Sequence, residues 1–249
     1  MTRNDTLVTR LLLSDILLQM NNQNNSSRQV SSAQSGVHSG LIDLLDRHRG
    51  REWSQPLHSP TIEAFEALKP LLARMGGKLV LDSGCGTGES TRLLARALPD
   101  CTVIGVDKSL ARLSRTGAHH FPHVEENAVW VRAELASFWR LALQAKWRLD
   151  RHYLLYPNPW PKPGQLQRRW HAHPVFPDLL RLGGRLEMRC NWKPYALEFT
   201  ASVNHLLGVH IAPGSPPAEP VLSPFERKYR QSGHRLYSVV VSVDSGRVK

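Results

Sequence analysis

Cysteines are few in this chain, and long apolar runs are absent from it. Its 249 residues contain three cysteines, Cys85, Cys101 and Cys190, which lie far apart and form no C-x-x-C pair. An odd number of scattered cysteines makes neither a disulfide framework nor a zinc signature, so we expect a reducing, cytoplasmic location and no metal. No apolar run approaches the roughly 20 residues that cross a bilayer, which predicts a protein without a membrane segment.

Acidic residues are scarce relative to basic ones. Lys and Arg number 32 against 21 Asp and Glu, which gives a formal net charge of +11 and a pI of about 10.1. Such a surface attracts polyanions, so nucleic acid is the first partner to test. The alternative is a soluble basic protein that binds no nucleic acid, and net charge alone does not distinguish it from a nucleic-acid-binding protein.

The composition changes near residue 40. Gln19–Gly40 is rich in Asn, Gln, Ser and Gly, and it offers too little apolar area to pack. Apolar residues with helix and strand spacing resume at Leu41 and continue to the end of the chain. We therefore predict a polar, flexible and largely disordered arm over residues 1–40 and one folded domain over residues 41–249.

The domain is organised around Lys78–Ser90, which reads K-L-V-L-D-S-G-C-G-T-G-E-S. A short apolar run ends in Asp82, three glycines follow at Gly84, Gly86 and Gly88, and a helical pattern comes next. A strand, a glycine turn and a helix form the local plan of a nucleotide-type cofactor site. Glycine permits positive φ and lets the backbone come close to a ligand.

An acid precedes these glycines, unlike in the dinucleotide fingerprint, which holds a pyrophosphate at the helix N-terminus. A carboxylate at Asp82 repels a phosphate but suits a cationic ligand such as S-adenosylmethionine, which carries an ammonium and a sulfonium. The D-x-G-x-G-x-G pattern resembles the first motif of class I methyltransferases. A glycine-rich turn that binds no ligand is the alternative.

Two further acids follow strand candidates. Asp107 ends the β-branched run Thr102–Val106, about 20 residues after the last glycine, where an acid binds ribose hydroxyls. Its alternative role is the N-cap of the following helix. Glu134 follows the candidate strand Ala128–Arg132, where an acid accepts a hydrogen bond from an adenine amino group.

Strand and helix patterns alternate along the domain. Further strand candidates are His152–Tyr156, Arg185–Arg189 and Leu236–Val243, and helical patterns occupy Thr61–Leu72, Ser137–Trp147 and Pro194–Leu207. This alternation predicts an α/β fold with a doubly wound, mostly parallel sheet and a site at the carboxyl ends of its strands.

A proline-rich stretch, Pro157–Lys162, follows one of these strands. Three prolines in P-N-P-W-P-K fix a rigid, extended turn that holds Asn158 at the carboxyl end of the strand. Arg168–His173 then interleaves cations with aromatic rings, which suits phosphate contact and base stacking. An ordinary charged helix face explains that second stretch equally well.

Three motifs in this part of the chain resemble those of the tRNA (guanine-N7-)-methyltransferases. They are Y-P-N-P-W-P-K, then C-N-W-K-P-Y-A at Cys190–Ala196, then S-P-F-E at Ser223–Glu226. That family shows F-P-D-P-W-x-K, T-D-W-x-x-Y-A and T-x-F-E in the same order, and the resemblance covers residues 60–240 of this chain. It implies a class I, Rossmann-like methyltransferase that uses S-adenosylmethionine to methylate N7 of a guanine in tRNA.

The resemblance also implies roles for single residues. Cofactor contacts fall on the first motif and the two later acids, with Asn158 beside both cofactor and catalysis: Asp82, Gly84, Gly86, Gly88, Asp107, Glu134 and Asn158. Substrate contacts fall on Lys162, Asn191, Ser223, Pro224, Phe225 and Glu226. Two departures stand out, because the family's carboxylates in P-D-P-W and T-D-W are both asparagines here, Asn158 and Asn191.

These asparagines affect the expected chemistry. Guanine N7 has a free lone pair, so methylation needs in-line placement and no general base, but the product purine is cationic. Losing one electrostatic contact to such a charge costs about 2.7–4 kcal/mol, so we expect a slower reaction unless Glu226 or Glu187 compensates.

Two alternatives to guanine N7 methylation follow from the sequence. Asn158-Pro159-Trp160 is similar to the (N/D)-P-P-(Y/F/W) motif of amino-group methyltransferases, in which the Asn carbonyl orients an exocyclic amine. The second alternative is a non-catalytic, RNA-binding paralogue. The intact Asp82, glycines and Asp107 argue against the second.

Overall fold

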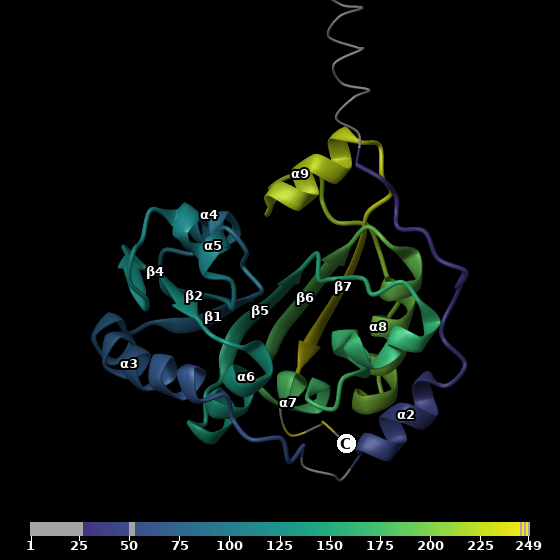
Figure 1. The fold of residues 1–249 in the computed structure, drawn as a ribbon, viewed down its shortest axis with the longest axis horizontal. Helices are drawn as coiled ribbons and strands as arrows, with labels where there is room; N and C mark the ends of the chain where they lie inside the picture. Colours follow the sequence, from purple (N-terminus) through teal and green to yellow (C-terminus); the bar gives the residue numbers. More distant parts are fainter. Residues whose placement is uncertain (1–26, 50–52, 245, 247, 249) are drawn as a thin grey trace, which may run out of the picture.

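The computed structural model describes residues 27–49, 53–244, 246 and 248. Its described residues form one seven-stranded sheet in the order β3-β4-β2-β1-β5-β6-β7 (Figure 1). The strands are β1 (Lys78–Ser83), β2 (Cys101–Asp107), β3 (His123–Glu125), β4 (Ala128–Arg132), β5 (Leu149–Leu155), β6 (Gly184–Cys190) and β7 (Tyr237–Val243). The central strands are parallel, whereas β3 and β7 are antiparallel edge strands.

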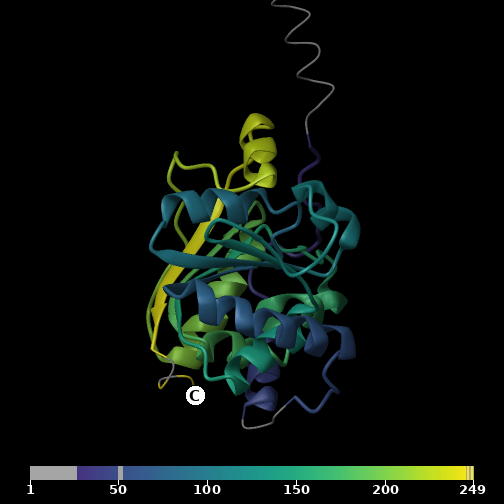
Figure 2. The same ribbon diagram turned by 90° about the vertical axis from the view of Figure 1, so that its left-hand side faces the viewer.

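Helices cover both faces of this sheet (Figure 2). One face carries α2 (Leu41–His48), α3 (Ser59–Met75), α6 (Leu135–Gln144), α7 (Phe176–Arg181) and α8 (Lys193–Leu207); the other carries α4 (Glu89–Ala97) and α5 (Leu110–Leu113). Each face buries its own apolar cluster, so the predicted doubly wound α/β fold is confirmed. Among the described helices, none has the length and apolar character needed to cross a membrane.

The predicted strands are confirmed, and their burial explains why sequence patterns located them. All seven residues of β2 are buried, as are the first four of β4, which is typical of parallel strands covered on both faces. Such strands are continuous apolar runs that stand out in a sequence. The short edge strand β3 was not predicted, because three residues, His123–Glu125, are too few to show a periodicity.

The chain changes direction across the sheet at β1. Strand β1 pairs with β2 on one side, from which the chain continues to β4, and it pairs with β5 on the other. Asp82 and Tyr153 are partners in the β1–β5 register. The segments that leave β1 and β5 therefore lie side by side at a topological switch point, where ligands bind in sheets of this type.

Residues 27–40 differ from the expected disordered arm. They run in an extended path from beside α9 (Pro224–Gln231) down to α2 (Figure 1). Gln34 Nε2 and the backbone N–H of His38 donate to Glu198 Oε1 of α8 at 2.6 and 3.0 Å. A buried carboxylate thus holds this polar segment, and Val30 packs against the apolar core. Residues 1–26 of the predicted arm lie outside the described residues.

Gly184 offers a test of the β5–β6 packing. Its φ is +80°, and a Cβ there would collide with the main-chain carbonyl oxygens of Leu149 and Asp150. We expect Gly184→Ala to lower the free energy of unfolding by about 1–3 kcal/mol, because rigid backbone cannot yield to the added carbon. Urea unfolding measures this difference.

Gly164→Ala is the matched control, since a Cβ at Gly164 meets nothing within 4 Å. Its effect is expected to stay within about 0.5 kcal/mol. Equal stability of the two variants would contradict the described approach of β6 to β5.

Candidate active site

The glycine turn after β1 leaves open space beside the backbone. Gly84, Gly86 and Gly88 have φ of 78°, 58° and 77°. A Cβ on Gly86 would meet nothing within 4 Å, and one on Gly84 only Leu135 Cδ1 at 3.9 Å. A Cβ on Gly88 would instead collide with Trp130. The first two glycines therefore border free space, and the third permits close packing of α4 on the sheet.

Asp82 is buried at the end of β1 with one oxygen unpartnered. Its Oδ2 accepts hydrogen bonds from Ser90 Oγ at 2.6 Å and Thr91 Oγ1 at 2.7 Å, whereas its buried Oδ1 has no partner among the described residues. Burial raises the pKa of Asp82 to about 6, against the lowering effect of the Ser90 and Thr91 hydroxyls. A lone buried acceptor of this kind suits a cationic donor.

Asp107, at the end of β2, holds the glycine turn in place. Its Oδ2 accepts from the backbone N–H of Gly86 at 3.0 Å, and its Oδ1 accepts from that of Ser109 at 2.8 Å. The N-cap alternative for Asp107 is wrong, because Ser109 is the N-cap of α5 and its Oγ accepts from the Arg112 N–H. The carboxylate therefore joins the ends of β1 and β2, where a ribose contact stays a prediction.

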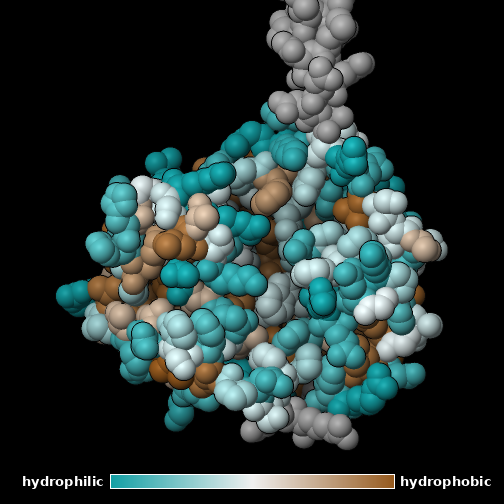
Figure 3. All heavy atoms as spheres, viewed as in Figure 1, coloured by the Kyte–Doolittle hydropathy of each residue, from teal (hydrophilic) through white to brown (hydrophobic). Residues whose placement is uncertain are grey.

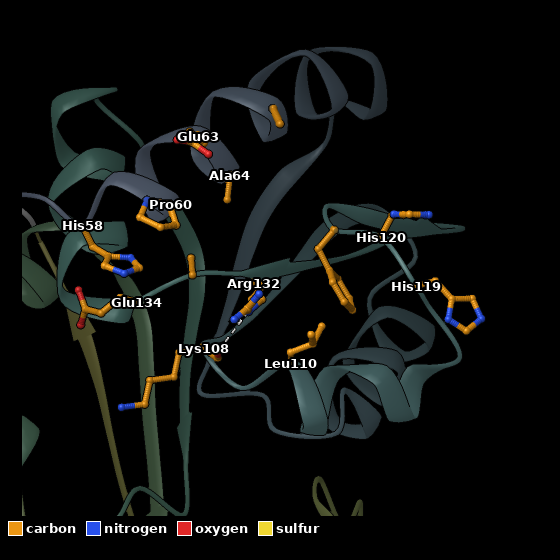
Figure 4. Close-up of a pocket in the computed structure, with 13 residues that line it drawn as sticks. His58, Pro60, Glu63, Ala64, Lys108, Leu110, His119, His120, Arg132 and Glu134 are labelled. Atoms are coloured by element: carbon orange, nitrogen blue, oxygen red, sulfur yellow. Dashed lines mark hydrogen bonds between the residues drawn. The ribbon is translucent and has the colours of Figure 1, made fainter.

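A cavity of about 680 Å³ opens at the carboxyl ends of β2 and β4 (Figure 4). Lys108 and Leu110 border it after β2, Arg132 at the end of β4, Glu134 after β4, and His58 before α3. Glu134 is the N-cap of α6, and its two oxygens accept from the backbone N–H groups of the first turn at 2.9 and 2.8 Å. Its predicted cofactor contact would have to use the remaining lone pairs of those oxygens.

The loop after β5 presents Asn158 to solvent. Two residues of this loop have positive φ without being glycine, Tyr156 at 51° and Trp160 at 45°. Side chains seldom adopt this region, and such strain gathers at functional sites. Asn158 and Lys162 are exposed, and no hydrogen bond of the Asn158 side chain is found within the described part of the chain. Its amide is free to meet a substrate.

Asn191 follows β6 and is held by a histidine. Its Nδ2 lies 3.1 Å from His234 Nδ1, and His234 Nε2 lies 2.8 Å from the carbonyl oxygen of Ser27. A carbonyl only accepts, so Nε2 carries the proton and Nδ1 accepts from the Asn191 amide. This arrangement leaves the Asn191 carbonyl oxygen available.

The S-P-F-E motif begins α9 and divides into inward and outward residues. Ser223 caps the helix by accepting from the Glu226 N–H at 3.1 Å, and Pro224 occupies the first turn. Glu226 is fully buried and accepts from Arg189 at 2.9 Å and Arg230 at 2.7 Å. Phe225 is 45% exposed, so it is the motif residue best placed to touch a substrate.

The carboxylates expected to replace the missing Asp charges are both engaged by arginines. Glu226 pairs with Arg189 and Arg230, and Glu187 pairs with Arg185 at 2.6 Å and with Arg189 at 2.7 Å. These contacts anchor α9 to β6 and oppose a compensating role for either acid at Asn158.

Comparison with known proteins places the chain in a family. Residues 77–239 match the Methyltransf_4 family model, described as "Putative methyltransferase". A tRNA (guanine-N(7)-)-methyltransferase of Halorhodospira halophila is 30% identical, and the match covers 65% of this chain and 73% of the relative. The tRNA (guanine-N(7)-)-methyltransferase of Stutzerimonas stutzeri is also 30% identical, and the match covers 63% of this chain and 68% of the relative. The chain belongs to the tRNA (guanine-N7-)-methyltransferase family.

A solved structure agrees with this methyltransferase fold. The "Structure of an Antibiotic Related Methyltransferase" superimposes with a TM-score of 0.51 at 16% identity and covers 72% of this chain and 94% of that chain. At that identity the likeness concerns the fold alone. The family assignment rests on the sequence matches.

The fold of this methyltransferase gathers most of the predicted residues at one edge of the sheet. Helix α9 lies over that edge, joined to the first turn of α4 by the ion pair of Arg227 with Glu89. Its Tyr229 packs on Tyr156 at a ring distance of 5.5 Å. The face below α9 is hollowed near its centre, with apolar residues visible in the hollow (Figure 3).

One sequence interpretation is wrong in its detail. Arg169 and His171 were expected to face RNA or solvent, but both are fully buried. Only the neighbouring Arg168 is exposed, and its guanidinium lies 4.9 Å from the Trp160 ring centroid. No periodicity marks Arg169 as internal, because it lies between two short 3-10 segments and not in a regular helix.

Proposed function

We propose that this protein uses S-adenosylmethionine to methylate N7 of a guanine in tRNA, and that it does so in the cytoplasm. The observation that carries the proposal is the β1–β5 switch point, where a buried acid with a free oxygen lies beside the loop that exposes Asn158. The name of the relatives supports the substrate, and a net charge of +11 suits a polyanion.

The residues present fit the cofactor. Open space beside Gly84 and Gly86 admits a ligand, and the free Asp82 oxygen is placed to accept from an ammonium. Asp107 would hold the ribose and Glu134, which lines the cavity, the adenine. When bound, S-adenosylmethionine supplies an electrophilic methyl group on a sulfonium.

The substrate side then has to orient a guanine and support its developing positive charge. N7 attacks with its own lone pair, so no side chain has to remove a proton. Asn158 offers a carbonyl dipole to the cationic purine, Lys162 lies in the same exposed loop for phosphate contact, and Phe225 presents a ring for stacking. Asn191 offers its carbonyl oxygen from the end of β6.

Nucleoside analysis tests this function. Unmodified tRNA is incubated with the protein and S-adenosylmethionine, digested and examined by mass spectrometry, and we expect 7-methylguanosine. A methyl group on an exocyclic amine would assign the enzyme to amine chemistry instead. Absence of any methylated nucleoside, with no S-adenosylmethionine binding by calorimetry, would identify an RNA-binding paralogue.

Asn158→Asp tests the electrostatic role of this side chain. A carboxylate stabilises the cationic purine better than an amide dipole, so kcat for N7 methylation should rise, by up to about 10²-fold. Single-turnover methylation of tRNA measures it. A sharp fall would mean that the amide orients an exocyclic amine.

Asp82 predicts a pH dependence of cofactor affinity. An ammonium prefers the ionised carboxylate, and with a pKa of about 6 the free side chain is mostly protonated at pH 5. We expect the Kd for S-adenosylmethionine to be about tenfold higher at pH 5 than at pH 7.5, as calorimetry measures. Without cofactor, the stability of the protein has the opposite pH dependence. Burial raises the pKa of Asp82 in the folded protein from 3.8 to about 6, so Asp82 favours the folded state at low pH. This contribution to stability is lost as the pH rises through 6.

Two variants complete this experiment. Asp82→Asn should bind more weakly at pH 7.5 and lose the pH dependence, whereas Glu66→Gln, which alters an exposed acid of α3, should keep it. A wild-type Kd that does not change between the two pH values would contradict the proposed contact of Asp82.

A further inference from the structure

A fully buried arginine lies directly behind the loop that carries Asn158. Arg169 and Glu198 are both inaccessible to solvent, and Arg169 Nη1 donates to Glu198 Oε2 at 2.5 Å. The guanidinium also lies 4.9 Å from the Trp192 ring centroid. A buried ion is destabilising unless its hydrogen-bonding groups are all well placed. The partners of the remaining Arg169 donors therefore indicate the role of this ion pair.

Two of the remaining N–H groups of Arg169 donate to main-chain carbonyls of the Pro157–Lys162 loop. Arg169 Nε donates to the carbonyl oxygen of Trp160 at 3.2 Å, and its Nη2 donates to that of Lys162 at 3.4 Å. Ser32 Oγ donates to the carbonyl oxygen between them, that of Pro161, at 2.5 Å. Three consecutive carbonyls of the loop are thus held, next to the strained φ of Trp160.

The segment before α2 completes the shell around the guanidinium. Gln34 Oε1 accepts from both Nη1 and Nη2 of Arg169 at 3.1 Å, and Gln34 Nε2 donates to Glu198 Oε1 at 2.6 Å. His171 Nε2 lies 3.0 Å from Glu198 Oε2 and donates to it. The buried Nδ1 of His171 has no partner among the described residues, which favours a neutral ring, and burial lowers the pKa of His171 against the raising effect of Glu198. The charges of Arg169 and Glu198 therefore neutralise each other, and Gln34 hydrogen-bonds to both.

We propose that Arg169 and Gln34 are positioning residues that hold the Pro157–Lys162 loop in the conformation that presents Asn158 to the substrate. Arg169 reaches the loop carbonyls directly, and Gln34 acts through Arg169. This inference rests on the proposed function, because it assigns these residues to the placement of its substrate-side group. Neither residue touches the glycine turn or Asp82, so the cofactor side is independent of them.

Two variants separate positioning from general stability. Arg169→Lys keeps the charge beside Glu198, but a single ammonium cannot replace the fork that serves Gln34 and two carbonyls. Gln34→Ala keeps the Arg169–Glu198 pair and removes its bridge. Gln29→Ala is the matched control, since Gln29 is an exposed residue of the same segment.

The expected result is a loss of kcat with cofactor binding retained. Gln34→Ala and Arg169→Lys should lower kcat for tRNA methylation by up to about 10²-fold, because small displacements of a reacting group are costly. The Kd for S-adenosylmethionine should change by less than about twofold, and Gln29→Ala should match the wild type. In an Asn158→Ala background, Gln34→Ala should lower kcat by less than about twofold further, since it acts through Asn158.

Two results would overturn the proposal. One is an unchanged kcat in folded Gln34→Ala; the other is a loss of equal size with and without Asn158. Amide hydrogen exchange of peptides that span residues 156–169 gives a second readout without activity. Exchange should accelerate in Gln34→Ala and Arg169→Lys but not in Gln29→Ala. If the wild type methylates no tRNA, the proposed function fails, while faster exchange still supports the positioning role and unchanged exchange refutes it.

Discussion

Parallel pairing of β1 with β5 brings the two central candidate segments of this methyltransferase together. Parallel strands end at one edge of a sheet, and the partnership of Asp82 with Tyr153 carries the glycine turn and the proline-rich loop to the same point of that edge. A shift of one residue would turn each side chain to the other face. The apolar packing that specifies this register on both faces therefore also specifies the active site.

The two halves of the site are built by different physical means. On the proposed cofactor side, glycines with positive φ shape the main chain, Asp107 accepts from the Gly86 N–H, and Asp82 accepts from the hydroxyls of Ser90 and Thr91. On the proposed substrate side, two buried arginines tie a helix and a loop to the core: Arg189 anchors α9, and Arg169 anchors the loop after β5. A guanidinium serves this purpose because its fixed fork satisfies several acceptors at once.

The sequence located the elements whose signal is local. Buried parallel strands are continuous apolar runs, and an acid followed by alternate glycines can be read within one strand, turn and helix. Local sequence patterns did not predict the burial of polar residues whose hydrogen-bond partners are distant in the sequence. Arg169 belongs to a charged stretch that suggested a surface, and residues 27–40 are polar enough to suggest disorder, yet each satisfies the other inside the fold. Composition cannot show this, because a polar group packs well wherever its hydrogen bonds are met.

By itself, then, the sequence determined the fold class and the family, and it predicted the cofactor residues, since each of these signals is a strand with the acid or glycine turn that directly follows it. The tertiary structure alone decided how the proposed substrate residues are held. Gln34 and Glu198 are 164 positions apart, yet they meet across a buried guanidinium. It also decided that Ser223 and Glu226 face inward while Phe225 faces outward. Contacts between residues so far apart follow from packing, and packing exists only once the sheet and its helices have formed.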